Sequence, residues 1–460
     1  MTRSKSHLFV IWTLLLTSIF IEALWAESPP PYSNATTDRR IHAKTPMLPR
    51  PRGVIFRDPD FGSRMLRVTD GSTNFKRPGT FLRTAGNGET NMWSRDSHKF
   101  YVLGSGGWLY AFGFDPINMK VTTLPGAQPG QGLLLPLRAA TFSVVDPDVV
   151  YGTTGKDPLT ITSYRFSTAV SSPVIDTTTC GTSPPLMKAP LVVSDDDLLA
   201  ATNDTRFSIS EGGPNAGAHM FVMVYDKTLG CRWYNTQTGE MGGQWGPAGN
   251  ATSSDRFPIR HSYLSKNGRY VRILVDYKGF YVWDIATLKV TPCYYRGMQA
   301  LECNGYGAMG YSSFVNGPAV IGGMQVAKRP LNNLARITEL VYPVPSPREF
   351  DYPLHFTWSN DLAGDNTPVC ASNYNYEGET DIDRAYAGEI FCIETDGLAS
   401  TIWRFAHNRA TWIDPYFNTQ PSGSISRDGR WFLFTSDWDA QLGTGADGAP
   451  RSDVYLVNLN

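Results

Sequence analysis

Two of the seven histidines in this 460-residue chain occupy matching positions in a repeated pattern. His261 and His355 each stand four residues before a serine that opens a short turn, and the position five residues before such a serine holds Arg260, Arg138 and Glu89. Elimination from an acidic sugar needs a base that removes the proton beside the carboxylate and a cation that neutralises the carboxylate as charge develops. We therefore expect a catalytic set in which His261 is the base and His355 a partner acid or ligand. The two arginines would hold the carboxylate, and Glu89 would contact the substrate.

A second group of candidates lies just before the last copy of this pattern. His407 and Arg409 fall in the connector that leads to it, Trp412 follows them, and Gln420 precedes the turn itself. Arg409 could hold a carboxylate, and the other three could contact a sugar by hydrogen bonding or ring stacking. We expect His407 and Arg409 to overhang the same opening as His261. The alternative for the whole set is an ordinary polar lining, since buried polar groups are normally hydrogen-bonded whatever their function.

The pattern that frames these residues recurs seven times after residue 60. Each copy has an apolar or aromatic pair, a serine, a turn that often carries Asp, Asn or Gly, and then a strand with aromatic residues. The copies lie at 92–96, 141–143, 192–196, 263–269, 310–313, 357–360 and 424–430. Successive serines are 49, 51, 71, 48, 46 and 67 residues apart. A repeat of about fifty residues is typical of architectures in which one structural unit recurs.

Each copy fits the first hairpin of a four-stranded blade. Gly268 follows Asn and Gly429 follows Asp, and such dipeptides adopt the positive φ angles of tight hairpin turns. The last copy runs out of chain after its third strand, whereas residues 64–69 form a strand without a blade. We predict an all-β fold, a seven-bladed β-propeller of four-stranded antiparallel blades, with the ring closed by this N-terminal strand completing the C-terminal blade. Six or eight blades are the alternative, and we assign the two long spacings to surface insertions near 205–220 and 361–386.

The Ser-x-Asp-Gly-Arg turn at 426–430 and the related turn at 265–269 resemble the repeat of TolB-like propellers, a group that includes oligogalacturonate lyases. This resemblance implies the propeller architecture. In the lyases a divalent metal is held by several histidines and a glutamine near the last blade. Gln420 stands in the matching stretch, 418–426, but Thr or Ser occupies the expected histidine positions, and His355 is at a ligand-like position. We therefore predict no metal ligands and no cofactor.

The N-terminal residues 1–26 have the layout of a secretory signal peptide. Basic residues precede an apolar run over 8–21, which is short for a bilayer span. Retention as a membrane anchor is the alternative. Residues 27–60 are rich in proline and charge and indicate an extended arm or linker, so the propeller would fill 61–460. We expect the mature protein to be secreted, extracellular or periplasmic, with no membrane span.

Six cysteines follow the signal segment, and an even number permits three disulfides in an oxidising compartment. The repeat layout favours pairs of neighbours in sequence. The predicted pairs are Cys180 with Cys231, Cys293 with Cys303, and Cys370 with Cys392. Metal binding by these residues is the weaker alternative, because no Cys-x-x-Cys spacing occurs.

Charge and motif content exclude several kinds of chemistry. Lys plus Arg number 41 and Asp plus Glu 42, a balance that gives no general attraction to nucleic acid or anionic membranes. No phosphate loop, dinucleotide fingerprint or Gly-x-Ser-x-Gly elbow opens a helix. Asp437, Asp439, Asp447 and Asp453 lack the calcium-loop pattern, and we expect a solvated turn there.

Two classes of function remain. The first is a secreted carbohydrate-active propeller, most plainly a polysaccharide lyase that acts on an acidic, uronate-containing glycan by β-elimination. The second is a non-catalytic propeller that binds a cell-surface glycan or a protein partner through loop aromatics. Convergence of two histidines and an arginine on one ligand favours the first class.

Overall fold

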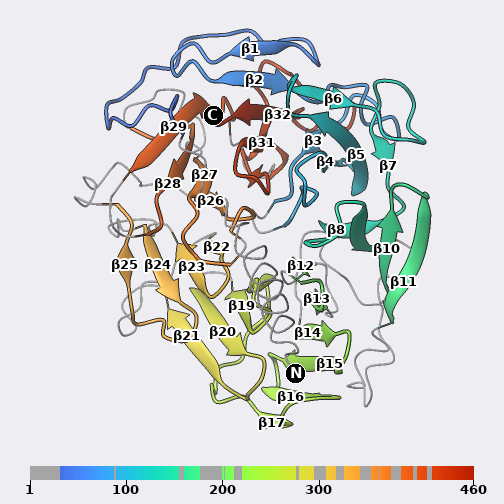
Figure 1. Ribbon diagram of the computed structural model, residues 1–460, viewed down its shortest axis with the longest axis vertical. Helices are drawn as coiled ribbons and strands as arrows, with labels where there is room; N and C mark the ends of the chain where they lie inside the picture. Colours follow the sequence, from blue (N-terminus) through green and yellow to red (C-terminus); the bar gives the residue numbers. More distant parts are fainter. Residues whose placement is uncertain are drawn as a thin grey trace, which may run out of the picture.

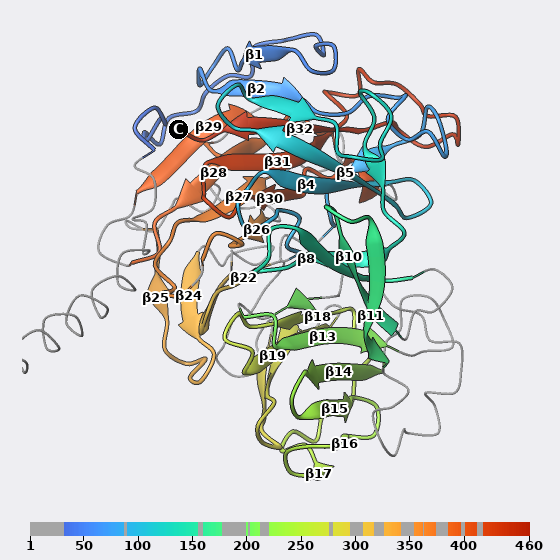
Figure 2. The same ribbon diagram turned by 45° about the vertical axis from the view of Figure 1, so that its right-hand side comes forward.

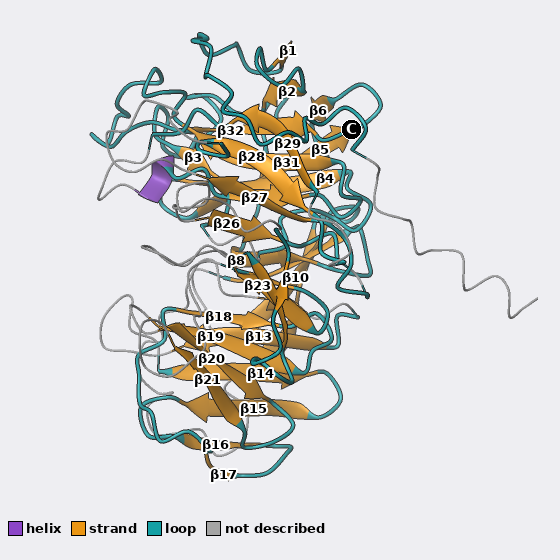
Figure 3. Ribbon diagram, turned by 90° about the vertical axis from the view of Figure 1, so that its left-hand side faces the viewer, coloured by secondary structure: helices purple, strands orange, loops and turns teal. Residues whose placement is uncertain are grey.

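The structure is a computed structural model that describes residues 32–86, 90–154, 160–176, 199–200, 203–211, 220–275, 279–294, 307–316, 326–341, 354–361, 363–373, 385–396, 401–411 and 417–460. Seven antiparallel sheets stand in a ring (Figure 1), which confirms the all-β seven-bladed propeller. Strands dominate the described part, and η3 (Phe417–Thr419) is a short helical turn in it (Figure 3). No helix of these residues is long and apolar enough to cross a membrane.

In each of the first three blades, the strands follow one another along the chain from the innermost to the outermost. They comprise β3 (Leu82–Arg83), β4 (Lys99–Gly104), β5 (Trp108–Asp115) and β6 (Lys120–Thr122), with β7 (Leu133–Leu134) also beside β5; β8 (Arg138–Phe142), β9 (Val149–Thr153), β10 (Thr160–Arg165) and β11 (Val170–Asp176); and β12 (Leu199–Ala200), β13 (Arg206–Glu211), β14 (Phe221–Asp226), β15 (Gly230–Asn235), β16 (Glu240–Gly243) and β17 (Gly249–Asn250).

The next three blades have four strands each in the same order. They comprise β18 (His261–Leu264), β19 (Tyr270–Val275), β20 (Gly279–Asp284) and β21 (Val290–Tyr294); β22 (Ala308–Met309), β23 (Ser313–Asn316), β24 (Ala327–Pro330) and β25 (Thr338–Glu339); and β26 (Leu354–Thr357), β27 (Val369–Asn373), β28 (Glu389–Ile393) and β29 (Ile402–His407).

The seventh blade joins the two ends of the described chain. Its strands, from the inside outward, are β30 (Gly423–Ile425), β31 (Trp431–Ser436), β32 (Asp453–Asn458), β2 (Arg64–Arg67) and β1 (Ile55–Arg57). Strand β2 pairs antiparallel with β32, so that Leu66 lies opposite Leu456 (Figure 2). Arg67 adds a buried ion pair with Asp453. The predicted closure of the ring by the N-terminal strand is therefore confirmed.

The repeated serine organises the inner hairpins. In three blades its hydroxyl donates to the Asp or Asn side chain two residues later and accepts the backbone N–H five residues later; these serines are Ser94, Ser265 and Ser426. Gly268 and Gly429 take the left-handed conformation of the turn, with φ of +68° and +72°. Local side-chain chemistry thus fixes where each inner strand turns, and with it the residues at the opposite end of that strand.

The prediction of surface insertions near 205–220 and 361–386 is wrong for part of each range. Arg206–Glu211 forms β13 and Val369–Asn373 forms β27, the second strands of their blades. The two serines of β13 gave it a loop-like composition, but both are buried in the sheet. The long spacing at the third blade arises from two additional outer strands, β16 and β17. The serine pattern predicted at 192–196 lies outside the described residues.

Covalent and aromatic contacts hold the blades together. The predicted disulfide Cys370–Cys392 joins β27 to β28 and is confirmed. Cys231 and Cys293 are also disulfide-bonded, and the partners predicted for them, Cys180 and Cys303, lie outside the described residues. Between blades, aromatic rings fill the space; Trp431 of the seventh blade, for example, meets Phe114 of the first with ring centres 4.9 Å apart.

Residues 32–60 lie along the last two blades (Figure 1). Thr36 exchanges two backbone hydrogen bonds with Arg404 of β29. The Tyr32 hydroxyl donates to the Gly429 carbonyl at 3.1 Å. The described part of the predicted arm is thus bound to the sixth and seventh blades, at residues distant from it in sequence.

Candidate active site

One face of the ring carries the residues that precede or begin the inner strands. Arg260 stands directly before β18 of the fourth blade, His355 is the second residue of β26 in the sixth, and Gln420 lies between η3 and β30 of the seventh. The inner strand β26 contacts the inner strands β22 and β30 of the two neighbouring blades. The charge of Arg260 and a hydrogen bond with the Gln420 side chain both act on the imidazole of His355. These three residues therefore lie at or shortly before the starts of inner strands, where the sequence pattern and the resemblance placed them.

His355 is at the centre of this group, and its side chain is buried, with 1% of its surface exposed. Burial is the main cause that lowers the pKa of the imidazole to about 4. The positive charge of Arg260 lowers the pKa further, and a hydrogen bond with the Gln420 side chain opposes both. The ring is consequently neutral at neutral pH. This state suits a hydrogen-bonding group better than the partner acid that we expected.

The segment around Gln420 is fixed in front of β26 by two hydroxyl groups. His355 lies opposite Ser372 in the pairing of β26 with β27, and the Ser372 hydroxyl donates to the Pro421 carbonyl. On the other side, Thr84 of the first blade donates its hydroxyl to the Ser422 carbonyl. Because the segment is tied to two blades, the Gln420 amide is held beside the imidazole.

His261 begins β18 next to Arg260, and its side chain is half buried. Its ring centre is 6.1 Å from that of Tyr263, as expected for residues two positions apart on one face of a strand. Tyr263 is buried and carries the Arg272 guanidinium over its ring. Arg272 in turn donates to the Gly307 carbonyl of the fifth blade. His261 is therefore on the side of β18 that faces the fifth blade.

Arg138 begins β8 at the same end of the ring but is engaged with the first blade. It donates to the Gly106 carbonyl at 2.6 Å, and its guanidinium lies 4.3 Å from the centre of the Trp108 ring. Its side chain is partly exposed. Trp108 was missed at the sequence level, because it begins a third strand and the pattern pointed only to residues before the serines.

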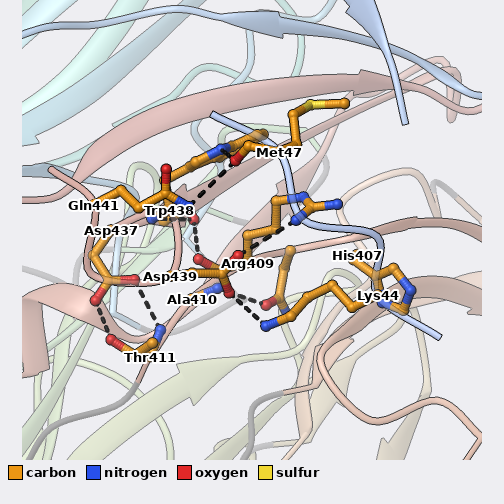
Figure 4. A network of polar contacts seen from close by, with 12 residues as sticks. Lys44, Met47, His407, Arg409, Ala410, Thr411, Asp437, Trp438, Asp439 and Gln441 are labelled. Atoms are coloured by element: carbon orange, nitrogen blue, oxygen red, sulfur yellow. Dashed lines mark hydrogen bonds and ion pairs between the residues drawn. The ribbon is translucent and has the colours of Figure 1, made fainter. Parts of the chain in front are cut away.

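The prediction that His407 and Arg409 overhang the open mouth is wrong. Both side chains are buried, with 0% and 1% of their surfaces exposed. Arg409 donates to the Thr45 carbonyl of the arm and pairs with Asp439, while Lys44 of the arm reaches the same carboxylate (Figure 4). His407 packs edge-on against Phe61, the residue that directly follows the arm, with ring centres 5.1 Å apart. The arm covers these two residues, and burial lowers the pKa of His407 to about 3.

Two predicted substrate-binding residues, Glu89 and Trp412, lie outside the described residues. Their contacts are therefore untested. Both stay predictions of the sequence pattern.

The described residues at the mouth do not fit a metal. One imidazole, His355, and one amide, Gln420, meet there, whereas metals in proteins normally take three or more protein ligands. Within the described ranges, no three His, Cys, Asp or Glu side chains form a group that could hold a metal ion. The charge of Arg260 would also repel a divalent cation.

The prediction of a solvated turn at the C-terminal aspartates is wrong for Asp437 and Asp453, whereas Asp447 lies exposed in a turn. Asp437 and Asp453 are buried, at 1% and 0% exposure. Asp453 pairs with Arg67 and with Arg451. Asp437 accepts hydrogen bonds from the backbone and hydroxyl of Thr411, and burial raises its pKa to about 6. Asp453 thus supports the closure of the last blade, whereas Asp437 binds the connector from the sixth blade.

No protein-family model and no curated protein matches the sequence. Solved structures match it over most of its length. An oligogalacturonate lyase in complex with manganese is 14% identical, covers 93% of this chain and 98% of its own, and has a TM-score of 0.53. An oligogalacturonate lyase from Vibrio parahaemolyticus is 10% identical over 89% and 98%, with a TM-score of 0.47. The WD40 domain of Neurospora crassa Pan2 is 12% identical over 89% and 97%, with a TM-score of 0.40.

At 14% identity this likeness establishes the fold and not the reaction. The class of protein is a seven-bladed propeller with the architecture of the manganese-bound oligogalacturonate lyase. The resemblance of the Ser-x-Asp-Gly-Arg repeat to such propellers is thereby confirmed at the level of architecture.

Proposed function

We propose that this chain is a secreted carbohydrate-active propeller that cleaves an acidic, uronate-containing polysaccharide by β-elimination. Two observations support the proposal: Arg260 and His355 lie at the starts of inner strands, and Arg260 and Gln420 both act on the imidazole of His355. A guanidinium binds a carboxylate through two parallel hydrogen bonds. A neutral imidazole and an amide offer further donors and acceptors to sugar hydroxyls. The architecture shared with an oligogalacturonate lyase is compatible with the same class of substrate.

In the proposed reaction Arg260 binds the carboxylate and stabilises the charge that develops on it. A base removes the proton on the carbon beside the carboxylate. The electron pair left behind forms a carbon–carbon double bond as the glycosidic carbon–oxygen bond breaks, and water protonates the leaving oxygen. His261 is our candidate base, because it begins β18 at the same end of the ring and keeps part of its side chain exposed.

The proposed reaction uses no metal. The oligogalacturonate lyase that shares this architecture was solved in complex with manganese, but the donor set here is one imidazole and one amide beside an arginine. We therefore assign the neutralisation of the substrate carboxylate to Arg260 alone. A chelator should leave the rate unchanged.

We also propose that the protein acts outside the cytoplasm. Cys231, Cys293, Cys370 and Cys392 are all disulfide-bonded, and disulfides persist mainly in oxidising compartments. The signal layout of 1–26 lies outside the described residues. N-terminal sequencing of protein recovered from the medium or the periplasm tests the expected cleavage after Ala26, and an intact N-terminus would contradict it.

The function is tested by incubating the protein with a panel of uronate-containing polysaccharides and following ultraviolet absorbance. β-Elimination leaves a double bond conjugated with the carboxylate, so each cleavage adds to the absorbance. We expect growth of this absorbance with an acidic polymer and none with its neutral counterpart. A flat trace with every uronate polymer would contradict the proposal.

A non-catalytic glycan-binding propeller is the second candidate, and one observation favours it. His355 has 1% of its surface exposed, and a buried side chain contacts substrate only if its surroundings move. Binding of an acidic glycan without any unsaturated product would support this candidate.

A further inference from the structure

A separate group of basic residues surrounds Trp108 on the mouth face of the first blade. The Arg138 guanidinium lies 4.3 Å from the centre of the Trp108 ring, and the Lys76 ammonium lies 5.9 Å from it. Arg77 reaches the turn just before this tryptophan, since a side chain placed on Gly106 would start 3.2 Å from the Arg77 guanidinium carbon. Three cations therefore converge on one indole. We call Lys76, Arg77, Trp108 and Arg138 the Trp108 platform.

The platform is held in place by its surroundings. Gly106 has a φ of +82°, which favours glycine, and its carbonyl accepts the 2.6 Å hydrogen bond from Arg138. Trp108 is half buried against the core of the first blade. Lys76 also lies 6.0 Å from the Phe75 ring. Lys76 and Arg77 are exposed, so the cationic ends remain open to solvent.

The three cations of the platform have no acidic partner among the residues that the structure describes. No carboxylate there forms an ion pair with Lys76, Arg77 or Arg138. Asp447 accepts a hydrogen bond from Ser105 in the adjoining turn, but it pairs with none of the three. Like charges held this close repel one another, and an anion bound between them relieves the repulsion.

Other arginines near this face are paired, which makes the platform distinctive. Arg52 lies 3.6 Å from a carboxylate oxygen of Asp70, and Arg451 lies 2.9 Å from one of Asp453. A carboxylate supplies the opposite charge, and the apolar face of a sugar ring suits the indole.

We propose that the Trp108 platform is a subsite that binds a second acidic sugar of the same glycan. The inference rests on the proposed function, because it assigns the platform the same substrate class as the mouth. It goes beyond that function by placing substrate on the first blade, away from His355. A uronate polymer carries a carboxylate on each sugar, so one chain can present charge to Arg260 and to the platform.

The test measures the dissociation constant of defined oligogalacturonates, about two to six sugars long, for the full-length protein by calorimetry at low salt. The variant combines Lys76→Gln, Arg77→Gln and Arg138→Gln. A matched control removes three exposed cations elsewhere, Lys120→Gln, Lys289→Gln and Arg336→Gln. We expect the platform variant to bind the longest oligomer about tenfold more weakly, and the control to bind as the wild type does. Added salt should weaken wild-type binding and narrow this difference.

Two additions keep the result interpretable. A variant with only Lys76→Gln and Arg77→Gln leaves the Arg138 contacts intact and should still lose part of the affinity if the triple variant does not fold. A methyl-esterified oligomer of the same length lacks the charge and should bind weakly to every variant. Tighter binding of a sulfated glycan than of the uronate would overturn the assignment to a uronate.

Parallel turnover measurements separate this proposal from the proposed function. Equal dissociation constants for the wild type and the platform variant, with the uronate polymer still cleaved, would refute the platform alone. Weaker binding by the variant, with no cleavage by any protein, would refute the lyase proposal and leave the platform standing.

Discussion

Arg260 and Gln420 act on the pKa of His355 in opposite directions, and burial decides the outcome. The pKa falls to about 4 because the imidazolium loses its hydration and faces a positive guanidinium. This balance gives the residue a measurable signature. It also explains why a pairing of histidine with arginine here provides a neutral hydrogen-bonding ring rather than a proton donor.

The signature is a dependence of stability on pH. In the unfolded chain His355 takes up its proton near pH 6.5, whereas in the folded chain it does so near pH 4. Above pH 6.5 the ring is neutral in both states; between pH 6.5 and 4 the unfolded chain binds the proton first, so the free energy of unfolding falls as the pH falls. The full loss is at most about 3 kcal/mol.

We expect His355→Gln to remove this dependence. Urea unfolding of the wild type and the variant at about pH 7, 5.5 and 4 gives the difference between their free energies. As the pH falls, the free energy of unfolding of the wild type should decrease relative to that of the variant. Replacement of the exposed His98 by Gln is the control, and its curve should run parallel to that of the wild type. Parallel curves for His355→Gln as well would contradict the electrostatics described here.

We expect the replacement of His261 to affect catalytic activity strongly and stability only slightly. Because the side chain is half buried, His261→Ala should change the free energy of unfolding by less than about 1 kcal/mol. If His261 is the base, the same variant should lose all measurable turnover. Thermal unfolding and the absorbance assay measure the two effects. A drop of many degrees in the melting temperature would instead show that the ring is a packing element between the fourth and fifth blades.

At the scale of elements, the inner hairpins could be predicted because their determinants are local. The Ser265 and Ser426 hydroxyls bond within their own turns, so a stretch of about seven residues carries the whole signal. Strand β13 could not be predicted in this way. Its serines are buried beside Phe207 and Ile209, and only the neighbouring strand β14 makes such a polar segment a strand.

The contribution of the closing strand β2 to the free energy of unfolding can be measured. Leu66 is buried at 1% exposure and pairs with Leu456 across the closure. Leu66→Ala should therefore lower the free energy of unfolding by about 2–4 kcal/mol, as measured by urea denaturation. Arg64→Ala on the same strand is the control, because that side chain is half buried, and it should cost much less. Equal effects of the two changes would show that the closure contributes no specific packing.

Across the whole molecule, the repeat pattern predicted those site residues that lie at or shortly before the start of an inner strand. Arg260, His355 and Gln420 stand five, four and six residues before the serines of their repeats, and Arg260 and Gln420 both act on the pKa of His355. His407 and Arg409 did not follow this rule because the arm covers them. The arm residues that contact them are more than three hundred positions earlier in the chain, and no local pattern reports such a contact.

In the proposed reaction an arginine, without a metal, neutralises the substrate carboxylate at the mouth. The measurement is the rate of ultraviolet absorbance growth on the preferred uronate polymer for the wild type and for Arg260→Gln, each with and without a chelator. We predict that the chelator leaves the wild-type rate unchanged and that Arg260→Gln lowers it by about 10²–10³-fold. Loss of the wild-type rate in chelator, or an undiminished rate for Arg260→Gln, would contradict the account.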